Sequence, residues 1–401
     1  MVDTEIISDI TGDERRDRLR LFRSENVGPV TYRQLVGHYG SAGEALDALP
    51  ALARRSGGRS GSRGGGRGGR AIKIYPADAA RDELDALDRL GAQLLTLGEP
   101  DYPVSLAAID DAPPVLTVRG HAELLTQPSV AIVGARNAST NGRNLAKRLA
   151  ADLSGADLSS QDLGDGAEGA RYVVVSGLAR GIDAAAHHGS LDAGGSTVAV
   201  MAGGVEVVYP PEHDALYMDI CTAGAVISEL PLGLRPQAAH FPRRNRIIAG
   251  LCLGVVVVEA ATRSGSLITA RLALEQGREV FAVPGSPLDP RSRGTNRLIR
   301  DGAILTETVA DIRSGLSPML AALPRAETDP PVLFEGLSRN EEDGLDSARN
   351  AIAACLSPTP VTVDEIVRQC QVTAPVVHTV ILEMELAGLI ERQPGNRIAA
   401  I

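Results

Sequence analysis

The sequence predicts an α/β protein built on a doubly wound, mainly parallel sheet, with smaller segments before and after it. Three observations predict this class. Short apolar runs alternate with amphipathic stretches between about residues 130 and 305. The runs are continuous rather than alternating, as in strands that are buried on both faces of a parallel sheet. Most of them stop at glycine, serine or proline, which is typical of a turn from a strand into a helix.

The expected strands are seven apolar runs, in chain order residues 130–133, 172–175, 197–201, 225–227, 254–258, 279–283 and 303–305. Between the first two runs, Leu145, Leu149 and Leu153 recur four residues apart, which indicates an amphipathic helix. Glycines follow several of the runs, and ligands of open α/β sheets bind at the carboxyl ends of the strands. We therefore expect the functional site in the turns after these strands.

The flanking segments have other patterns. Residues 13–53 are expected to be helical, and the turn Val27-Gly28-Pro29 gives them the outline of a helix-hairpin-helix unit. Such a hairpin either offers backbone N–H groups to a phosphate or is an accessory domain that binds nothing. Residues 345–401 are expected to form three helices and a β-wing with strands at 389–392 and 397–399.

The predicted organisation is a helical domain at 1–53, a linker at 54–70, the sheet domain at 71–315, a second linker at 316–344 and a C-terminal domain at 345–401. The first linker holds only arginine, glycine and serine, so it cannot bury a core. It is either a plain flexible linker or an electrostatic tether for single-stranded nucleic acid. The stretch 154–169 is expected to be a surface insertion.

Composition excludes several classes of protein. No apolar run approaches the roughly 20 residues that span a bilayer, and the acidic, polar N-terminus is no secretory signal. The four cysteines lie far apart without a CxxC pair, which favours reduced thiols in a cytoplasmic protein over a disulfide framework or a zinc site. No residue pattern requires a metal or another cofactor, and no catalytic pair is evident. We expect a binding protein rather than an enzyme.

The formal net charge of −10 argues weakly against a nucleic-acid partner. The distribution of charge weakens this argument, because residues 1–70 carry a net +3 whereas residues 321–401 carry −6. Of the 40 cationic residues, 38 are arginine. Arginine can bind phosphate through two N–H groups and stack on bases, so we expect an anion to bind locally.

Arginines follow the first two predicted strands. Arg136 lies in a turn that is neither a dinucleotide GxGxxG nor a P-loop, and it either contacts an anion or forms a salt bridge. Arg180 lies in the next turn. Asp183 and His187, four residues apart, are an acid–base pair, half a metal site or, as we favour, joined by an intrahelical hydrogen bond that fixes the turn.

The stretch 240–250 combines an aromatic residue with cations. Just before an apolar helix, Phe241 is followed by Arg243, Arg244, Asn245 and Arg246. Arginines neutralise phosphates and phenylalanine stacks on bases, a combination that binds single strands; salt bridges that cap the sheet are the alternative. Ser264-Gly265-Ser266, flanked by Arg263, is a second helix start that either cradles a phosphate or only caps the helix.

Seven motifs in the same order from Tyr102 to Ala303 resemble those of the DNA-processing protein A family (DprA, also called Smf), among them VAIVGAR, SGLARGIDAAAH and FPRRNRIIAGL. The resemblance implies an extended Rossmann-like fold with a helix-hairpin-helix (SAM-like) domain and a winged helix. It also implies that single-stranded DNA binds at the carboxyl ends of the strands. The expected contacts are Arg136, Gly177, Arg180, Phe241, Arg243, Arg244, Asn245, Arg246, Arg263, Gly265 and Ser266.

The resemblance further implies two protein partners. One is the RecA recombinase, which is loaded on incoming DNA during natural transformation, and the other is a second copy bound through the Rossmann-like domain. No membrane is implied. The presumed recognition helix of the winged helix, residues 374–386, carries Glu383 and Glu385 and no arginine or lysine. We therefore expect it to make protein contacts rather than to bind DNA.

Two other functions are weighed against DNA binding. The first is a nucleotide phosphoribohydrolase on a related Rossmann-like fold. Such enzymes carry a PGGxGTxxE motif, where this chain has SGSLITARLALE. The second is a carrier that holds a small nucleotide or cofactor at the same sheet edge.

Overall fold

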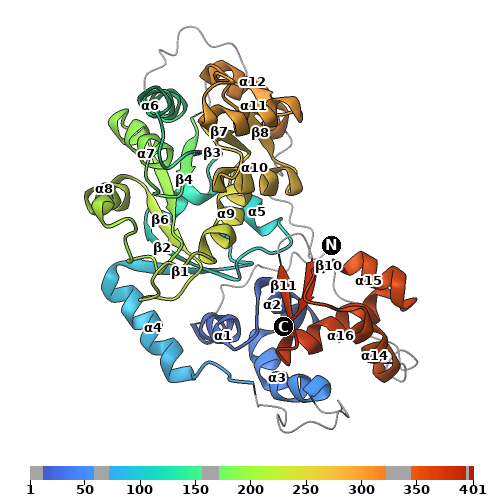
Figure 1. Cartoon of the computed structure of the whole chain (residues 1–401). Helices are drawn as coiled ribbons and strands as arrows, with labels where there is room; N and C mark the ends of the chain where they lie inside the picture. Colours follow the sequence, from blue (N-terminus) through green and yellow to red (C-terminus); the bar gives the residue numbers. More distant parts are fainter. Residues whose placement is uncertain (1–11, 58–71, 156–170, 322–344, 394–396) are drawn as a thin grey trace, which may run out of the picture. The chain divides into compact units, whose positions relative to one another are not determined.

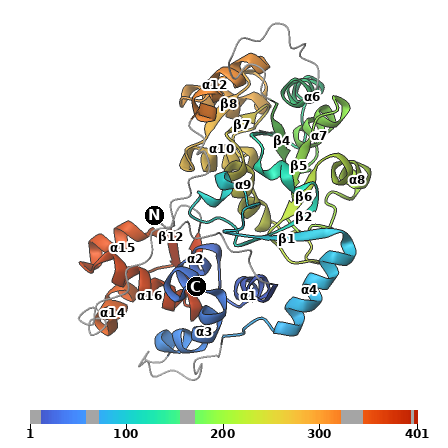
Figure 2. The same cartoon turned by 180° about the vertical axis from the view of Figure 1, so that it is seen from behind.

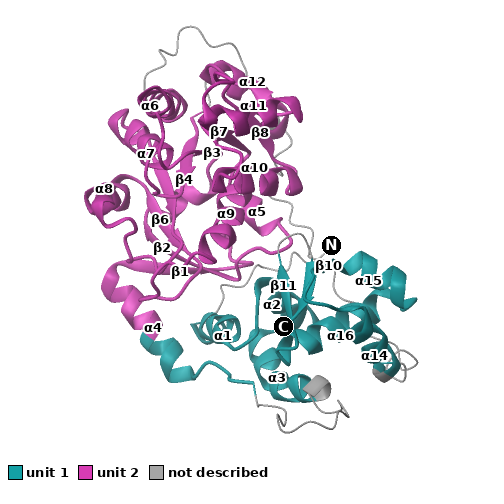
Figure 3. Cartoon of the chain, viewed as in Figure 1, with its two compact units in different colours: residues 1–82, 328–401 teal, residues 83–327 magenta. Residues whose placement is uncertain are grey.

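The computed structural model describes residues 12–57, 72–155, 171–321, 345–393 and 397–401 (Figure 1). They fall into two compact units, one drawn from residues 1–82 and 328–401 and the other from residues 83–327 (Figure 3). The predicted segments at 54–70, 154–169 and 316–344 lie largely outside the described residues. Each unit is described by itself.

The second unit holds a nine-stranded sheet in the order β1-β2-β6-β5-β4-β3-β7-β8-β9, which confirms the predicted doubly wound α/β class (Figure 2). Along the sheet, neighbouring strands from β6 through β5, β4, β3, β7 and β8 to β9 are parallel. Strand β2 pairs antiparallel with both β1 and β6. The strands are β1 (Ala92–Thr96), β2 (Val115–Gly120), β3 (Ser129–Val133), β4 (Val173–Ser176), β5 (Thr197–Val200), β6 (Ala225–Ser228), β7 (Gly254–Val257), β8 (Glu279–Ala282) and β9 (Ile304–Leu305).

The seven predicted runs all form strands, with ends that differ by one or two residues. The antiparallel strands β1 and β2 have no predicted counterpart. Their pairing extends the sheet on the β6 side, with Leu95 opposite Leu116 and Thr117 opposite Ser228. The sheet is therefore wider than the apolar runs alone indicate.

Helices cover both faces of this sheet. In the second unit they are α5 (Val104–Ala107), α6 (Thr140–Ser154), α7 (Ile182–Asp192), α8 (Asp214–Ala223), α9 (His240–Leu251), α10 (Gly265–Glu275), α11 (Arg293–Arg300) and α12 (Val309–Ala321), and α4 (Ala77–Leu90) crosses the boundary between the units. In the part of the chain that the structure describes, none of the helices has the length and apolarity that crossing a membrane requires.

The side chains of β3 explain why its run is continuously apolar. Ala131 and Val133 belong to the core beneath α9 and α10, whereas Val130 and Ile132 belong to the core beneath α6, α7 and α12. Successive side chains of a strand point to opposite faces. Because both faces are buried, the run from Val130 to Val133 is apolar throughout. Ser129, at the start of the strand, is also buried and donates its hydroxyl to the carbonyl oxygen of Leu251.

The first unit joins the two ends of the chain. Its helices are α1 (Gly12–Arg23), α2 (Pro29–Tyr39), α3 (Ala42–Gly57), α14 (Leu345–Cys355), α15 (Val363–Cys370) and α16 (Ala374–Leu386). A three-stranded sheet in the order β10-β12-β11 completes the winged helix, with β10 (Val361–Thr362), β11 (Ile390–Gln393) and β12 (Arg397–Ala400). The predicted three helices and β-wing are confirmed.

Helix α3 is longer than predicted. The helical region is expected to end at residue 53 and the linker to begin at Arg54, but α3 continues to Gly57. Leu49, Leu52 and Ala53 are all buried in one core. The burial of these apolar side chains outweighs the backbone hydrogen bond that Pro50 cannot donate.

Helix α16 belongs to two cores at once. Its Val377 and Ile381 pack in the winged-helix core, whereas Leu386 is buried in the core of the N-terminal helices, beside Tyr32 and Leu35. The predicted organisation treats residues 1–53 and 345–401 as separate domains; the structure packs their described parts into one unit.

The two acidic residues of α16 are internal. Glu385 accepts a hydrogen bond from Thr31 Oγ1 (2.7 Å) and pairs with Arg392 (3.4 Å), and Glu383 pairs with Arg349 (2.7 Å). Both acids are buried. The N-terminal helices cover part of α16, and the expectation that this helix makes protein contacts rather than binding DNA stays a prediction.

Shortening Leu386 to alanine is expected to destabilise the first unit by about 2–5 kcal/mol, because the cavity opens in the core that α16 shares with α2 and α3. Leu389→Ala is the matched control: this side chain is 44 % exposed, against 1 % for Leu386, and should change stability by less than about 0.5 kcal/mol. Urea unfolding measures both. Hydrogen exchange should also rise in α2 and α3; unchanged exchange there would contradict a shared core.

Candidate nucleic-acid interface

The candidate site lies where neighbouring strands end. Strands β3, β4 and β5 are adjacent and parallel, so their carboxyl ends meet at one edge of the sheet. Arg136 follows β3, the turn 177–181 follows β4, and Met201 follows β5. The start of α9 adds Phe241 to the same edge. The structure thus brings together the turns that the sequence singles out.

An arginine and two aromatic rings form the exposed part of the site. The guanidinium carbon of Arg136 lies 4.9 Å from the centre of the Phe241 ring, within the range of a cation–π contact. The ring of Tyr209 lies 5.8 Å from that of Phe241 at an angle of 59°. Arg136 and Tyr209 are exposed and Phe241 is half-buried.

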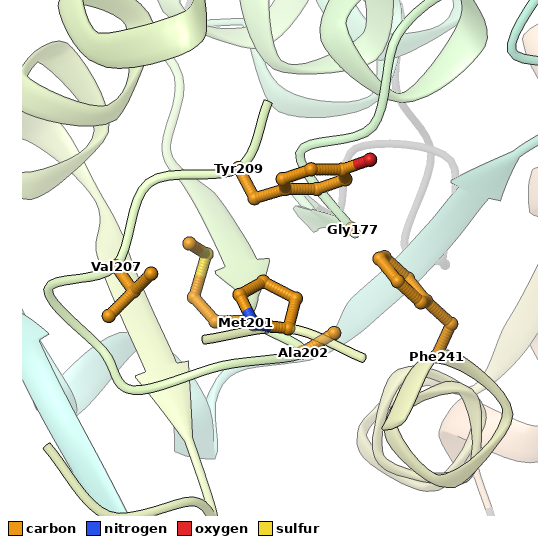
Figure 4. A pocket seen from close by; sticks show the side chains of 7 residues that line it. Gly177, Met201, Ala202, Val207, Tyr209 and Phe241 are labelled. Atoms are coloured by element: carbon orange, nitrogen blue, oxygen red, sulfur yellow. The ribbon is translucent and has the colours of Figure 1, made fainter. Parts of the chain in front are cut away.

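A small hollow lies beside these rings, lined by Gly177, Met201, Ala202, Val207, Tyr209, Pro236 and Phe241 (Figure 4). Most of the lining side chains are apolar, and Tyr209 and Phe241 offer aromatic faces on which a flat ring can stack.

Arg244 is buried next to this hollow. Its Nη1 donates to the carbonyl oxygen of Val200 at 2.6 Å, while its Nε has no hydrogen-bond partner among the described atoms. A Cβ at position 177 would lie 1.9 Å from Nη1 of Arg244, so a larger residue there requires the guanidinium to move. Burial lowers the pKa of Arg244 to about 10, partly offset by the carboxylate of Asp183, so the guanidinium stays charged at neutral pH.

Asp183 and His187 fix the turn after β4. Asp183 accepts hydrogen bonds from the N–H groups of Gly177 (3.2 Å) and Ala179 (3.3 Å), and His187 Nε2 accepts one from the N–H of Leu178 (3.4 Å). Burial lowers the pKa of His187 to about 3 and raises the pKa of Asp183. Both groups fix the turn, but through hydrogen bonds to its backbone rather than through the expected intrahelical hydrogen bond.

Two predicted contact residues of α9 point inward. Arg246 bonds to the carboxylate of Glu229 and to the carbonyl oxygen of Asp111, and its side chain is only 7 % exposed. Asn245 is also buried, and its Nδ2 donates to the carbonyl oxygen of Gly265 at 3.4 Å. Both side chains therefore hold α9 against its neighbours, and we expect them to support the site rather than to touch a ligand.

The other predicted residues lie on the surface or at a helix cap. Arg180, Arg243 and Arg263 are exposed, and Arg180 forms an ion pair with Glu212. Gly265 is exposed at the start of α10, where Ser264 caps the helix and bonds to the hydroxyl of Ser266 at 2.8 Å.

Sequence reasoning missed the role of Glu259. This residue follows β7, and β7 lies beside β3. Its carboxylate accepts hydrogen bonds from the backbone N–H (2.9 Å) and the hydroxyl of Ser139, which caps α6. A carboxylate of the protein itself therefore occupies the helix start where Rossmann-like proteins bind a phosphate. Finding this from the sequence requires the strand order, since 120 residues separate the two.

The wide, mainly parallel sheet with arginines at its carboxyl edge defines a Rossmann-like α/β protein with a cationic sheet edge. The chain belongs to the DNA recombination-mediator protein A family, whose model matches residues 93–317. The models of a DprA-like N-terminal HHH domain and of a DprA winged helix domain match residues 12–86 and 338–396. These matches confirm the family that the sequence motifs indicate.

Relatives match over most of the chain. Protein Smf of Synechocystis sp. is 32 % identical over 93 % of this chain and 95 % of its own length. Protein Smf of Escherichia coli is 36 % identical over 81 % of this chain and 82 % of its own length. The chain is also similar to the X-ray structure of DNA processing protein A (DprA) from Streptococcus pneumoniae, with 34 % identity and a TM-score of 0.57. This match covers 77 % of this chain and 98 % of the chain in that structure.

Replacing His187 by glutamine is expected to reduce the acid sensitivity of the second unit. His187 titrates near pH 3 in the folded chain and near 6.5 when unfolded. Its contribution to stability is therefore complete above pH 6.5 and is lost as the pH falls toward 3, by up to about 1.4 kcal/mol per pH unit. Urea unfolding from pH 7 to pH 4 measures this slope. The control is His188→Gln, on an exposed neighbour; equal slopes in the two variants would contradict the assignment.

Proposed function

We propose that this chain binds single-stranded DNA along the carboxyl edge of β3, β4 and β5 and at the start of α9. The observation that carries this proposal is the pairing of Arg136 with Phe241 beside an open hollow. Aromatic faces stack on bases and arginines neutralise the backbone, which together bind single strands without reading their sequence. A relative of this chain is named DNA processing protein A, and this name agrees with the proposed function.

We divide the predicted contact residues by exposure. Arg136, Arg180, Arg243 and Arg263 have exposed side chains suited to phosphates, whereas Arg244, Asn245 and Arg246 are buried and position the helix start. A phosphate at Arg180 replaces the carboxylate of Glu212. Both members of that ion pair are largely exposed, and such a pair contributes only about 0–1 kcal/mol, so the exchange is easy.

The position of Glu259 weighs against the two other candidate functions. A nucleotide bound in the usual Rossmann manner places its phosphates at the start of the helix after the first strand. Here the carboxylate of Glu259 holds that position through Ser139. Like charges repel, so we favour DNA binding over a phosphoribohydrolase or a nucleotide carrier.

The finer parts of the proposal come from the family resemblance. The chain loads RecA on incoming DNA during natural transformation, acts in the cytoplasm without catalysis, and pairs with a second copy through the Rossmann-like unit. Copurification of the protein with RecA filaments on single-stranded DNA tests the first partner. Sedimentation of the protein alone tests the second copy. Release of a free base from AMP would instead support the phosphoribohydrolase.

Arg136→Ala and Arg180→Ala are each expected to weaken binding to an oligo-dT about tenfold, which is the size of one charge-assisted hydrogen bond. Each should also lower the slope of log affinity against log salt by about 0.7, since one phosphate contact is lost. Arg271→Ala is the matched control, an exposed arginine of α10 paired with Glu275. Fluorescence anisotropy at several salt concentrations measures the affinities. Equal affinity in all three variants would refute the assigned edge.

Phe241→Ala is expected to weaken binding between about fivefold and 100-fold through loss of base stacking, at an unchanged salt slope. Phe241→Tyr keeps an aromatic face and should bind like the original protein. The same anisotropy titrations separate the two contributions. A lower salt slope for Phe241→Ala would mean that the ring acts only by placing Arg136, and stacking would then be rejected.

A further inference from the structure

Two cysteines of the winged helix lie in contact. Cys355 is the last residue of α14 and Cys370 the last residue of α15, and their sulfur atoms are 3.4 Å apart. Their separation of 15 residues along the sequence does not indicate this contact. The 14 intervening residues fold back because α14 and α15 pack against each other.

The surroundings of the pair are those of a dithiol rather than of a metal site. Both side chains are half-buried, and Cys370 packs against the winged-helix core. No group of three or more metal-ligating side chains occurs among the described residues. Burial and the neighbouring thiol raise the pKa of Cys370 to about 11, so it is a thiol at neutral pH.

The geometry points to a redox modification site: we propose that Cys355 and Cys370 form a reversible intramolecular disulfide by exchange with a small-molecule disulfide. The thiolate of one cysteine attacks the oxidant and releases one small thiol. The second cysteine then attacks the protein sulfur of this mixed disulfide and releases another small thiol. Two protein thiols are oxidised, one disulfide is reduced, and the two protons leave on the released thiols.

Little movement is needed to form this bond. The sulfur atoms must approach from 3.4 Å to about 2.05 Å. Both residues end their helices, where the backbone is less constrained than inside a helix. Gln371 already leaves the helical conformation, with φ of 52°. The bond would fasten the ends of α14 and α15 together and so restrict the unfolded chain.

The full-length protein, incubated with oxidised glutathione and then denatured, tests the proposal. We expect the number of reactive thiols to fall from four to two and non-reduced peptide mapping to recover Cys355 linked to Cys370. Reduction should restore four thiols. Cys221→Ser and Cys252→Ser should keep the bond, whereas Cys355→Ser and Cys370→Ser should lose it. Four remaining thiols, or glutathione held separately on either cysteine, would overturn the proposal.

The dependence on pH and temperature provides a second readout. Exchange runs through the thiolate, so its rate should rise up to about tenfold per pH unit between pH 7 and pH 9. Oxidation should raise the melting temperature of the original protein and leave that of Cys355→Ser unchanged. Equal melting shifts in both proteins would show that the oxidant acts elsewhere, and the proposed clamp would be rejected.

Discussion

One buried cation organises the candidate site. The guanidinium of Arg244 lies over Gly177 and donates to the carbonyl oxygen of Val200, so it joins the start of α9 to the turns after β4 and β5. Removing a guanidinium from water without such partners costs several kcal/mol, and this penalty holds α9 in one place. Phe241, about one helical turn earlier, then meets Arg136. The contact between Phe241 and Arg136 thus depends on Arg244, a buried charge that no ligand needs to touch.

The sequence predicts those strands of the sheet whose side chains are buried on both faces. The strands from β3 to β8 contain continuous apolar runs because helices cover both of their faces. The pattern failed at β1 and β2, whose antiparallel pairing depends on contacts with residues far along the chain. Strand order was equally hidden, and with it the placement of Glu259 at the start of α6.

The site could be predicted as a set of residues but not as an arrangement. Arg243, Arg244 and Arg246 are chemically alike, yet the first is exposed and the other two are buried. Which face of α9 turns inward depends on how the helix docks. In the same way, the acids of α16 led us to expect a helix that avoids DNA, but their internal contacts with Thr31 and Arg349 could not be predicted from the sequence.

The shared core of the first unit has a consequence for the order in which the chain folds on the ribosome. Thr31 and Glu385 bond to each other although 354 residues separate them. At roughly 5–20 residues per second, synthesis takes roughly 20–70 seconds to travel from one to the other. The N-terminal helices must therefore wait, with part of their apolar surface uncovered, until nearly the whole protein has been made. The second unit lies between these two residues in the sequence and can complete its fold first.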